Sequence, residues 1–160
     1  MVYNGFLTRR NMTTKLTSPV QTPKLPLGLF DTVPEDAFNF GIGKRFDAKR
    51  ITELLNLKKQ DVSRLASVSA QSVRYDEAIP EQVRDRLEEI GITINMVAKV
   101  FDGDVEKTAV WFRARNPMLG DVSPRDMIRL GRFERLRKFI ITAMSANEAQ
   151  VRRARSEEHT

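Results

Sequence analysis

The residues from Asp61 to Tyr75 read DVSRLASVSAQSVRY, and their spacing predicts two short helices joined by a tight turn. Val62 and Leu65 supply the apolar contacts of the first helix, and Val73 anchors the second. Ser69 is a suitable N-cap for the second helix, because its hydroxyl oxygen can accept a hydrogen bond from a backbone N–H of the first turn. The stretch therefore has the pattern of a helix-turn-helix.

Once the apolar positions are buried, the remaining side chains of the predicted second helix point outward. They are short, hydrogen-bonding or cationic, which suits the major groove, since glutamine pairs with adenine and arginine with guanine. Basic residues in the first helix are suited to phosphate contacts. The predicted DNA-binding residues are Lys58, Lys59, Arg64, Ser69, Ala70, Gln71, Ser72 and Arg74.

Some features of the stretch also fit an ordinary helical corner. Ser67 occupies the turn position that often holds glycine, and Asp76 and Glu77 place negative charge where phosphate would lie. This alternative stays open, because compact helical domains contain many such corners. The residues from about Phe46 to Ile90 resemble the DNA-binding domains of Xre-type bacterial repressors, and that resemblance implies DNA reading.

The composition excludes several classes of chemistry. The 160 residues include no cysteine and a single histidine, His159, which rules out disulfides, thiolate metal sites and histidine-based triads. The sequence GIGKR, from Gly41 to Arg45, lacks the spacing of a phosphate-binding Walker loop. We therefore predict no enzymatic activity, no catalytic residue, no metal site and no cofactor.

Charge and hydropathy indicate the kind of partner and the location. Lysine and arginine outnumber aspartate and glutamate by 27 to 21, giving a net charge of +6, which favours a polyanionic partner. No apolar run approaches the roughly 18 residues that suggest a membrane span, and no apolar block follows the N-terminal basic residues as in a secretory signal. We expect a cytoplasmic protein without membrane contact.

From Phe46 onward the apolar residues recur at helical spacing and no hairpin pattern appears, so the predicted fold class is all-α. Gly91 is expected to end one helix before another begins. The last helix is expected to run unbroken through Leu130 to Ile140 and to fray after Ser145. The expected helices begin at Asp47, near Lys58, after Ser69, at Pro80, near Ile94, at Asp104 and at Ser123–Pro124.

The first part of the chain has a different character. Residues 1–45 contain four prolines and no helical periodicity, which predicts an irregular N-terminal arm that can include a small strand. Part of its apolar cluster, which is Leu25, Leu27, Leu29, Phe30, Phe38 and Phe40, is expected to pack on the main body or on a partner. The predicted division is an arm at 1–45, a helix-turn-helix DNA-binding domain at 46–92, a small helical domain at 93–145 and a basic C-terminal tail at 146–160.

The lone tryptophan, Trp111, precedes the loop sequence NPMLGDVSP, from Asn116 to Pro124. On physical grounds Trp111 fills a gap in the core, Pro117 stops a helix and Gly120 permits a positive φ. The order of these residues resembles the toxin-binding domain of Xre/MbcA/ParS antitoxins over about Met96 to Met144, most specifically in Asn-Pro-x-Leu-Gly-x-x-Ser-Pro. Further residues that carry the resemblance are Phe101, Lys107, Leu130, Gly131 and Arg132.

This resemblance implies the antitoxin of a type II toxin–antitoxin pair. The implied partner is a RES-domain toxin that consumes NAD or ADP-ribosylates a target, and the antitoxin also represses the shared operon. Two-fold repressors bind successive major grooves, so we expect a homodimer and a 2:2 or larger complex with the toxin. The predicted toxin-binding residues are Trp111, Arg115, Asn116, Leu119, Arg132, Arg135, Arg152, Arg153 and Arg155.

Several alternatives remain on the sequence alone. The tail after Ser145 either covers the NAD pocket of the toxin or is a solvated end. The protein is alternatively a stand-alone transcription regulator without a toxin, in which the last helix touches DNA. A third reading is an interaction module whose repressor-like half only dimerises. The basic residues on the last helix that would face DNA are Arg129, Arg132, Arg135, Arg137 and Lys138.

Overall fold

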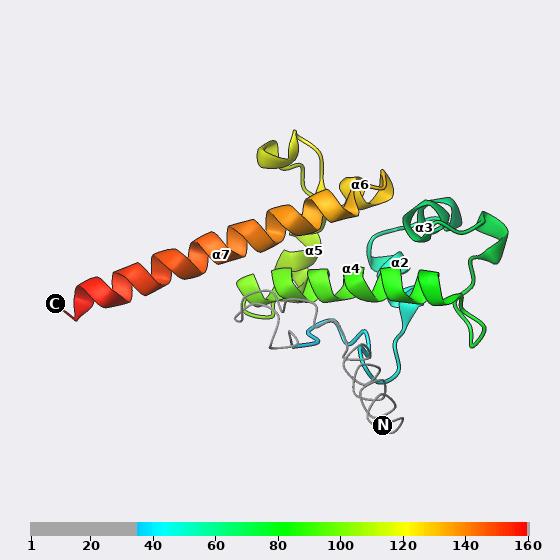
Figure 1. Ribbon diagram of the computed structural model, residues 1–160, viewed down its shortest axis with the longest axis horizontal. Coiled ribbons are helices and arrows are strands. Elements are labelled where there is room, and N and C mark those ends of the chain that lie inside the picture. Colours follow the sequence, from blue (N-terminus) through cyan, green and yellow to red (C-terminus); the bar gives the residue numbers. More distant parts are fainter. Residues whose placement is uncertain (1–34, 160) are drawn as a thin grey trace, which may run out of the picture. The chain divides into compact units, whose positions relative to one another are not determined.

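Helices account for all the regular structure in residues 35–159, which are the residues that the computed structural model describes (Figure 1). Within this range there is no strand, only an isolated bridge between Asn116 and Val122. The prediction of an all-α fold is thus confirmed for these residues, which all belong to one compact unit. The helices are α2 (Ala48–Leu54), α3 (Lys59–Ala66), α4 (Glu81–Val100), α5 (Val105–Arg113), α6 (Pro124–Arg129) and α7 (Phe133–Glu158), with single 3-10 turns η1 (Ala70–Ser72) and η2 (Pro117–Leu119).

Helix α4 is the centre of the fold and contacts α2, α3, α5 and α7. It joins two segments predicted as separate helices, so the prediction that Gly91 ends a helix is wrong. Gly91 lies in the helix interior, where a Cβ would stand 2.8 Å from the Cδ1 of Ile51. The glycine is therefore explained by the close crossing of α2 over α4, and not by a helix end.

The core runs without interruption along α4. Ile51 and Leu87 are fully buried, and so are Ile94 and Leu136 further along the chain. These residues belong to one hydrophobic cluster. The predicted boundary between residues 92 and 93 falls inside α4, so the two predicted helical domains share this helix and its core.

The predicted helix starts are largely correct. The side chains of Asp47, Asp104 and Ser123 each accept a hydrogen bond from a backbone N–H in the first turn of the following helix, as N-caps do. Pro80 stands one position earlier than predicted, as the N-cap of α4 instead of its first residue.

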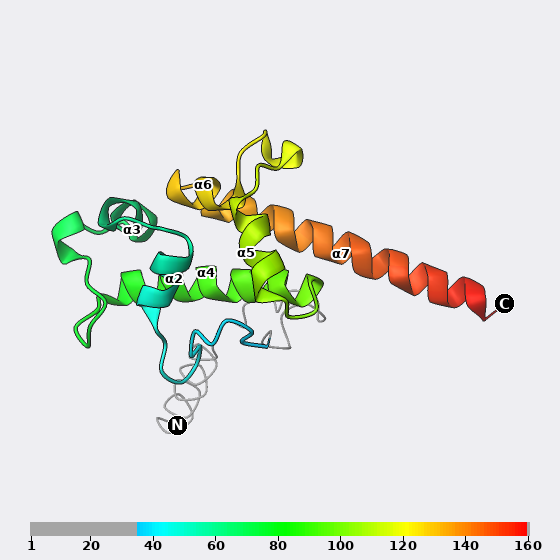
Figure 2. The ribbon, with the colours of Figure 1, turned by 180° about the vertical axis from the view of Figure 1, so that it is seen from behind.

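The last predicted helix is in fact two helices, α6 and α7, so its prediction as one unbroken helix is wrong. Gly131 has a φ of 76°, which ends α6 just after Leu130. Leu130, which was predicted to lie inside the last helix, instead follows the end of α6 and is 54% exposed. The break lets α7 leave α6 in a new direction (Figures 1 and 2).

The segment after Ser145 is helical, so the predicted fraying is wrong. Helix α7 continues to Glu158, and every residue from Ser145 to His159 is exposed. The segment is rich in alanine, glutamate, glutamine and arginine, which have high helix propensity. The predicted basic tail is therefore a projecting helix.

A short segment before α2 is tied to α4. The carboxylate of Asp36 accepts hydrogen bonds from the backbone N–H groups of Phe40 (2.9 Å) and Gly41 (2.8 Å) and from Nδ2 of Asn95 (3.0 Å). Phe40 is 1% exposed and stacks on Phe38 with a centroid distance of 5.4 Å. The prediction that apolar residues of the arm pack on the main body is confirmed for these two phenylalanines. Leu25, Leu27, Leu29, Phe30 and any small strand before residue 35 lie outside the described residues.

Candidate functional site

The stretch Asp61 to Tyr75 forms a helix and a turn, but its predicted second helix is only the single 3-10 turn η1. Ser67 adopts a left-handed conformation (φ 55°) in the turn, and Val73 is buried as predicted. Ser69 does not cap a helix, because its hydroxyl lies 2.7 Å from that of Ser72. The backbone is then extended at Val73, which stops the turn from growing into an α-helix.

The residues predicted to bind DNA divide into two groups. Lys58 and Lys59 are exposed, and so are the polar residues of η1. Arg64 is engaged, since its Nη1 donates to the backbone oxygen of Arg129 at 2.7 Å. One group is exposed and open to a partner, and the other forms hydrogen bonds within the protein. The second group is Arg64 and Arg74. The first group is Lys58, Lys59, Ser69, Ala70, Gln71 and Ser72.

Arg74 is bound by the carboxylate of Asp76, with its Nε donating to Oδ1 at 2.6 Å and its Nη2 donating to Oδ2. These hydrogen bonds raise the pKa of the Arg74 guanidinium and lower the pKa of the Asp76 carboxyl. Both groups are exposed, so solvent weakens the pair. For Arg74 to read a base, this contact with Asp76 must first open.

The loop after α5 is held by its own residues. The side chain of Asn116 accepts a hydrogen bond from the N–H of Met118 (3.0 Å), and its backbone N–H donates to Val122 (3.2 Å). Gly120 has the predicted positive φ of 78°. Asn116 is thus structural, and the loop presents Met118 and Leu119 on the ordered turn η2.

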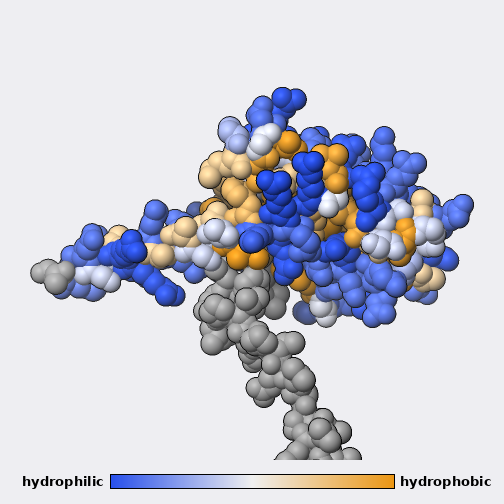
Figure 3. Space-filling view, turned by 45° about the horizontal axis from the view of Figure 1, so that its top comes forward, coloured by the Kyte–Doolittle hydropathy of each residue, from blue (hydrophilic) through white to orange (hydrophobic). Residues whose placement is uncertain are grey.

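Exposed apolar residues mark this part of the molecule. Val110 on α5 is 62% exposed and Met118 in η2 is 78% exposed. Trp111 is half-buried against the edge of Phe112, with ring centroids 5.1 Å apart, and Leu119 is also half-buried. Figure 3 shows apolar surface at the top of the molecule, above the root of α7. Val110, Trp111, Met118 and Leu119 lie on two successive elements of the chain, and we refer to them together as the α5–η2 surface.

The arginines predicted to bind a toxin are spread over two regions. Arg115 is exposed in the loop after α5, with a long ion pair to Asp121 of 3.9 Å. Arg132 is the N-cap of α7, and the other predicted arginines, Arg135, Arg152, Arg153 and Arg155, are exposed along this helix. At about 100° per residue, Arg135 and Arg153 lie on one side of α7 and Arg155 lies about 160° away.

Two exposed residues of the α5–η2 surface were absent from the predicted site. Val110 lies on the helix that was predicted to begin at Asp104, which also carries the core residue Phe112. Met118 is the variable position of the loop sequence NPMLGDVSP. The sequence gives no signal that separates an exposed valine from a buried one on such a short helix. Their exposure follows from how α5 and η2 sit on the core.

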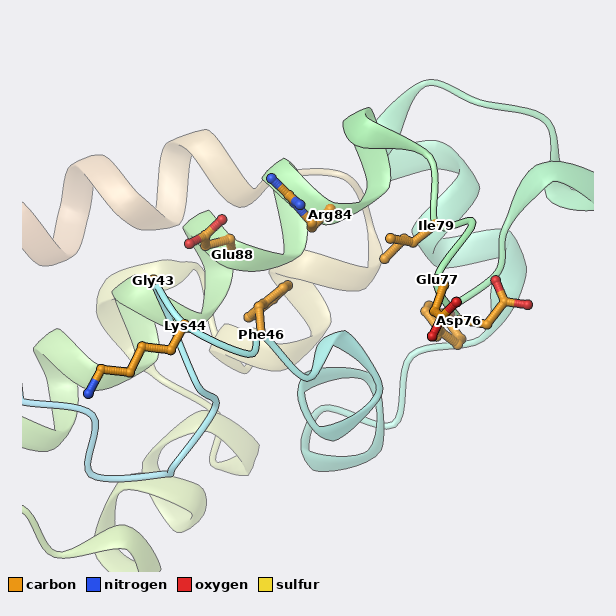
Figure 4. A pocket seen from close by; sticks show the side chains of 9 residues that line it. Gly43, Lys44, Phe46, Asp76, Glu77, Ile79, Arg84 and Glu88 are labelled. Atoms are coloured by element: carbon orange, nitrogen blue, oxygen red, sulfur yellow. The ribbon is translucent and has the colours of Figure 1, made fainter.

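A cavity of about 600 Å³ opens on a different part of the surface (Figure 4). Arg84 and Glu88 reach it from α4, and Asp76 and Glu77 from the segment before α4. Burial raises the pKa of Tyr75, although a hydrogen bond with Thr52 opposes the shift. The lining contains no serine, cysteine or histidine. It consists of Gly43, Lys44, Phe46, Tyr75, Asp76, Glu77, Ile79, Arg84 and Glu88.

Residues 35–159 contain no group of three or more histidine, cysteine, aspartate or glutamate side chains that could hold a metal ion. No helix in the same range has the length and apolar character to cross a bilayer.

The chain matches no family model, no curated protein and no solved structure.

Proposed function

We propose that this chain is an antitoxin that neutralises a RES-domain toxin by direct binding and represses the operon that encodes both. The observation that carries the proposal is the exposure of Val110 (62%) and Met118 (78%) on α5 and η2. Large apolar side chains that stay exposed are typical of protein-binding surfaces. The class of partner, an enzyme that consumes NAD or ADP-ribosylates a target, comes from the resemblance of this loop to antitoxins.

The loop is prepared for binding because its shape is fixed before a partner arrives. Asn116 holds Met118 through a side-chain hydrogen bond, and Ser123 caps the helix that follows. A surface that is already ordered loses less conformational entropy on association. Met118 and Leu119 thus act as anchors, and Asn116 positions them.

The projecting end of α7 is suited to covering the toxin's NAD site. Met144 and Val151 continue the face on which Ile140 packs into the body, and Val151 is 45% exposed. Arg155 lies close to the same face by helical spacing. Its guanidinium supplies a cation that can compete for groups that recognise the phosphates of NAD.

Operator binding is assigned to α3 and η1. Lys58, Lys59, Gln71 and Ser72 are exposed. In the proposed complex the two lysines contact phosphate, and Gln71 and Ser72 contact base edges. A homodimer would present two such surfaces to successive grooves. The toxin complex is then 2:2 or larger.

The test is co-expression with the product of the adjacent gene, followed by affinity purification of the full chain. Met118→Asp combined with Val110→Asp should abolish co-purification of the toxin, because charge on an apolar contact is not paired after binding. Val100→Asp is the matched control, since Val100 is 52% exposed at the end of α4. Retention of the toxin by the double variant, or the absence of any companion protein with the wild type, contradicts the proposal.

Truncation after Ser145 separates docking from inhibition. The truncated chain should still capture the toxin through the α5–η2 surface but leave its NAD-consuming activity intact. Unchanged inhibition would instead place the block around Trp111 to Pro124.

A second candidate function is a transcription regulator without a toxin. The exposed basic residues Arg132, Arg135 and Lys138 of the last helix favour it, since they are suited to phosphate. A neighbouring gene for a RES-domain protein supports the antitoxin, and its absence supports the regulator.

A further inference from the structure

Helix α7 stands clear of the body over its C-terminal half. Every residue from Ser145 to His159 is exposed, a length of about 22 Å at 1.5 Å per residue. The residues that α7 buries in the body are Phe133, Leu136 and Ile140. Figures 1 and 2 show this half of α7 projecting beyond the other helices, so this half can enter a groove about as wide as itself.

One side of this helix carries a basic stripe at helical spacing. The members follow one another at intervals of three or four residues, which places them within a sector of about 80° at 100° per residue. All of them are exposed, and the sector is opposite the face that packs on the body. The basic stripe consists of Arg135, Lys138, Thr142, Ser145, Ala149 and Arg153.

Arg135, Lys138 and Arg153 carry the positive charge of the stripe. None of the three nitrogen-bearing side chains lies within 4.0 Å of a carboxylate oxygen of residues 35–159. Arg137, between them in sequence, is turned away by helical spacing and lies 3.9 Å from Glu134. Of the carboxylates of α7, Glu134 and Glu157 stand four residues from Lys138 and Arg153 and flank the sector, whereas Glu148 and Glu158 lie farther round the helix.

We propose that the basic stripe binds double-stranded DNA, with the C-terminal half of α7 lying in the major groove. Arg135 and Lys138 at one end and Arg153 at the other then contact phosphates of the two strands, about 22 to 27 Å apart along the helix. The small side chains between them face the base edges. The major groove is about 12 Å wide and an α-helix is about 10 to 12 Å in diameter, so the helix fits.

This assignment goes beyond operator binding by α3 and η1 and uses a different side of α7 from the one proposed to meet the toxin. It assigns Arg135 and Arg153, which the sequence placed in the toxin site, to DNA. The stripe is also unlike a membrane-binding helix face, because none of its members is a large apolar residue. Duplex RNA fits less well, since its major groove is too deep and narrow for side chains to read.

The test measures the affinity of the full chain for a 30-base-pair duplex from its own upstream region, by fluorescence anisotropy, between 50 and 200 mM salt. The stripe variant is Arg135→Ala, Lys138→Ala and Arg153→Ala. The control is Lys107→Ala, Arg113→Ala and Arg137→Ala, which removes equal charge outside the stripe. Circular dichroism and thermal melting verify that both variants fold.

Loss of three phosphate contacts should reduce the slope of log affinity against log salt by about 2.7, because each contact contributes about 0.9. Over this salt range the wild type should lose about 40-fold more affinity than the stripe variant. The control should retain the wild-type slope.

Several outcomes would overturn the proposal. These are absence of duplex binding by the wild type at 50 mM salt, equal losses in the stripe and control variants, and tighter binding to duplex RNA or to phosphatidylserine vesicles. Loss of binding in Gln71→Ala with Arg74→Ala, but not in the stripe variant, would assign DNA to η1 and its flank instead. Toxin capture is scored separately, so failure of either proposal is recognised by itself.

Discussion

The guanidinium of Arg64 closes the C-terminal end of α6, because its Nη1 donates a hydrogen bond to the backbone oxygen of Arg129 at 2.7 Å. The last carbonyl groups of a helix have no partner inside the helix, so this contact satisfies one of them. The side chain of Arg129 forms an ion pair with α3, because its Nε lies 3.8 Å from the carboxylate of Asp61. The two arginines thus join α3 to α6.

Arg64→Ala should lower the free energy of unfolding by about 1 kcal/mol, the typical net contribution of one hydrogen bond. Lys59→Ala, on the exposed side of the same helix, should change it by no more than about 0.5 kcal/mol, as is usual for surface substitutions. Urea unfolding of the two variants makes the comparison. If Arg64→Ala is as stable as the wild type and instead weakens DNA binding, Arg64 contacts phosphate and not α6.

Gly91→Ala tests the crossing of α2 over α4. Alanine favours the helix by about 1 kcal/mol over glycine, but its Cβ would lie 2.8 Å from Cδ1 of Ile51, which is fully buried. Overpacking of this kind costs about 1 to 3 kcal/mol, so the single variant should be no more stable than the wild type, despite the gain in propensity. Ile51→Val removes Cδ1, and Gly91→Ala should then be stabilising.

The control for this pair is the double-mutant cycle, because Ile51→Val alone costs about 0.5 to 1.5 kcal/mol. The two changes should show a favourable interaction of about 1 kcal/mol or more, which is typical of residues in contact. Additive effects in urea unfolding would show that Gly91 is free of steric constraint from α2.

Local signals predicted the fold class and most helix starts, but not where helices join or break. A carboxylate or hydroxyl at Asp47, Asp104 or Ser123 acts within one turn, so its role as a cap follows from neighbouring residues alone. Gly91 and Gly131 look alike in sequence, yet one permits a tertiary crossing and the other a positive φ. Only contacts with distant residues distinguish these two uses of glycine.

The candidate sites were predictable to different extents. The Asn116–Pro117 loop folds as its sequence indicates, because the cap, the proline and Gly120 are all local determinants. The prediction of an α-helix after Ser69 was wrong, because only the single turn η1 forms there. Ser69 and Val73 fit the pattern of an α-helix, but the hydroxyl of Ser69 contacts that of Ser72 instead of capping a helix. The exposure of Val110 depends on how α5 packs, which no local pattern encodes.

Stability should depend on pH through Asp36. Burial alone would raise the pKa of its carboxyl, but hydrogen bonds from Phe40, Asn95 and Gly41 outweigh burial and hold it below the ordinary value of 3.8. A depressed pKa in the folded state means stability that is present above about pH 4 and lost as the pH falls through the folded-state pKa. Thermal melting should therefore show that the wild type is more stable than Asp36→Asn above about pH 4 and that this difference shrinks as the pH falls further. Parallel melting curves for the two proteins across this range would refute the role of Asp36.

Arg86 on α4 contacts α3 and α7, and variants of this residue measure how much each contact contributes to stability. Its Nε donates to the backbone oxygen of Leu65 at 3.0 Å, its Nη1 to Glu134 at 2.6 Å, and its guanidinium lies 5.7 Å from the ring centre of Phe133. The side chain of Glu134 is 63% exposed, so solvent weakens that pair and Glu134→Gln should cost less than about 1 kcal/mol. Arg86→Ala should cost about 2 kcal/mol, since it also leaves the Leu65 carbonyl and the Phe133 ring without their partner.

Arg86→Lys should not restore stability, because one ammonium group cannot replace the planar fork that reaches Leu65 and Glu134 together. Arg84→Ala is the matched control on α4, since Arg84 is exposed and lines the cavity instead of the core. Urea unfolding should place Arg86→Lys near Arg86→Ala, and Arg84→Ala near the wild type. Full stability of Arg86→Lys would mean that a positive charge is enough to hold α3, α4 and α7 together. The planar shape of the guanidinium would then contribute nothing to stability.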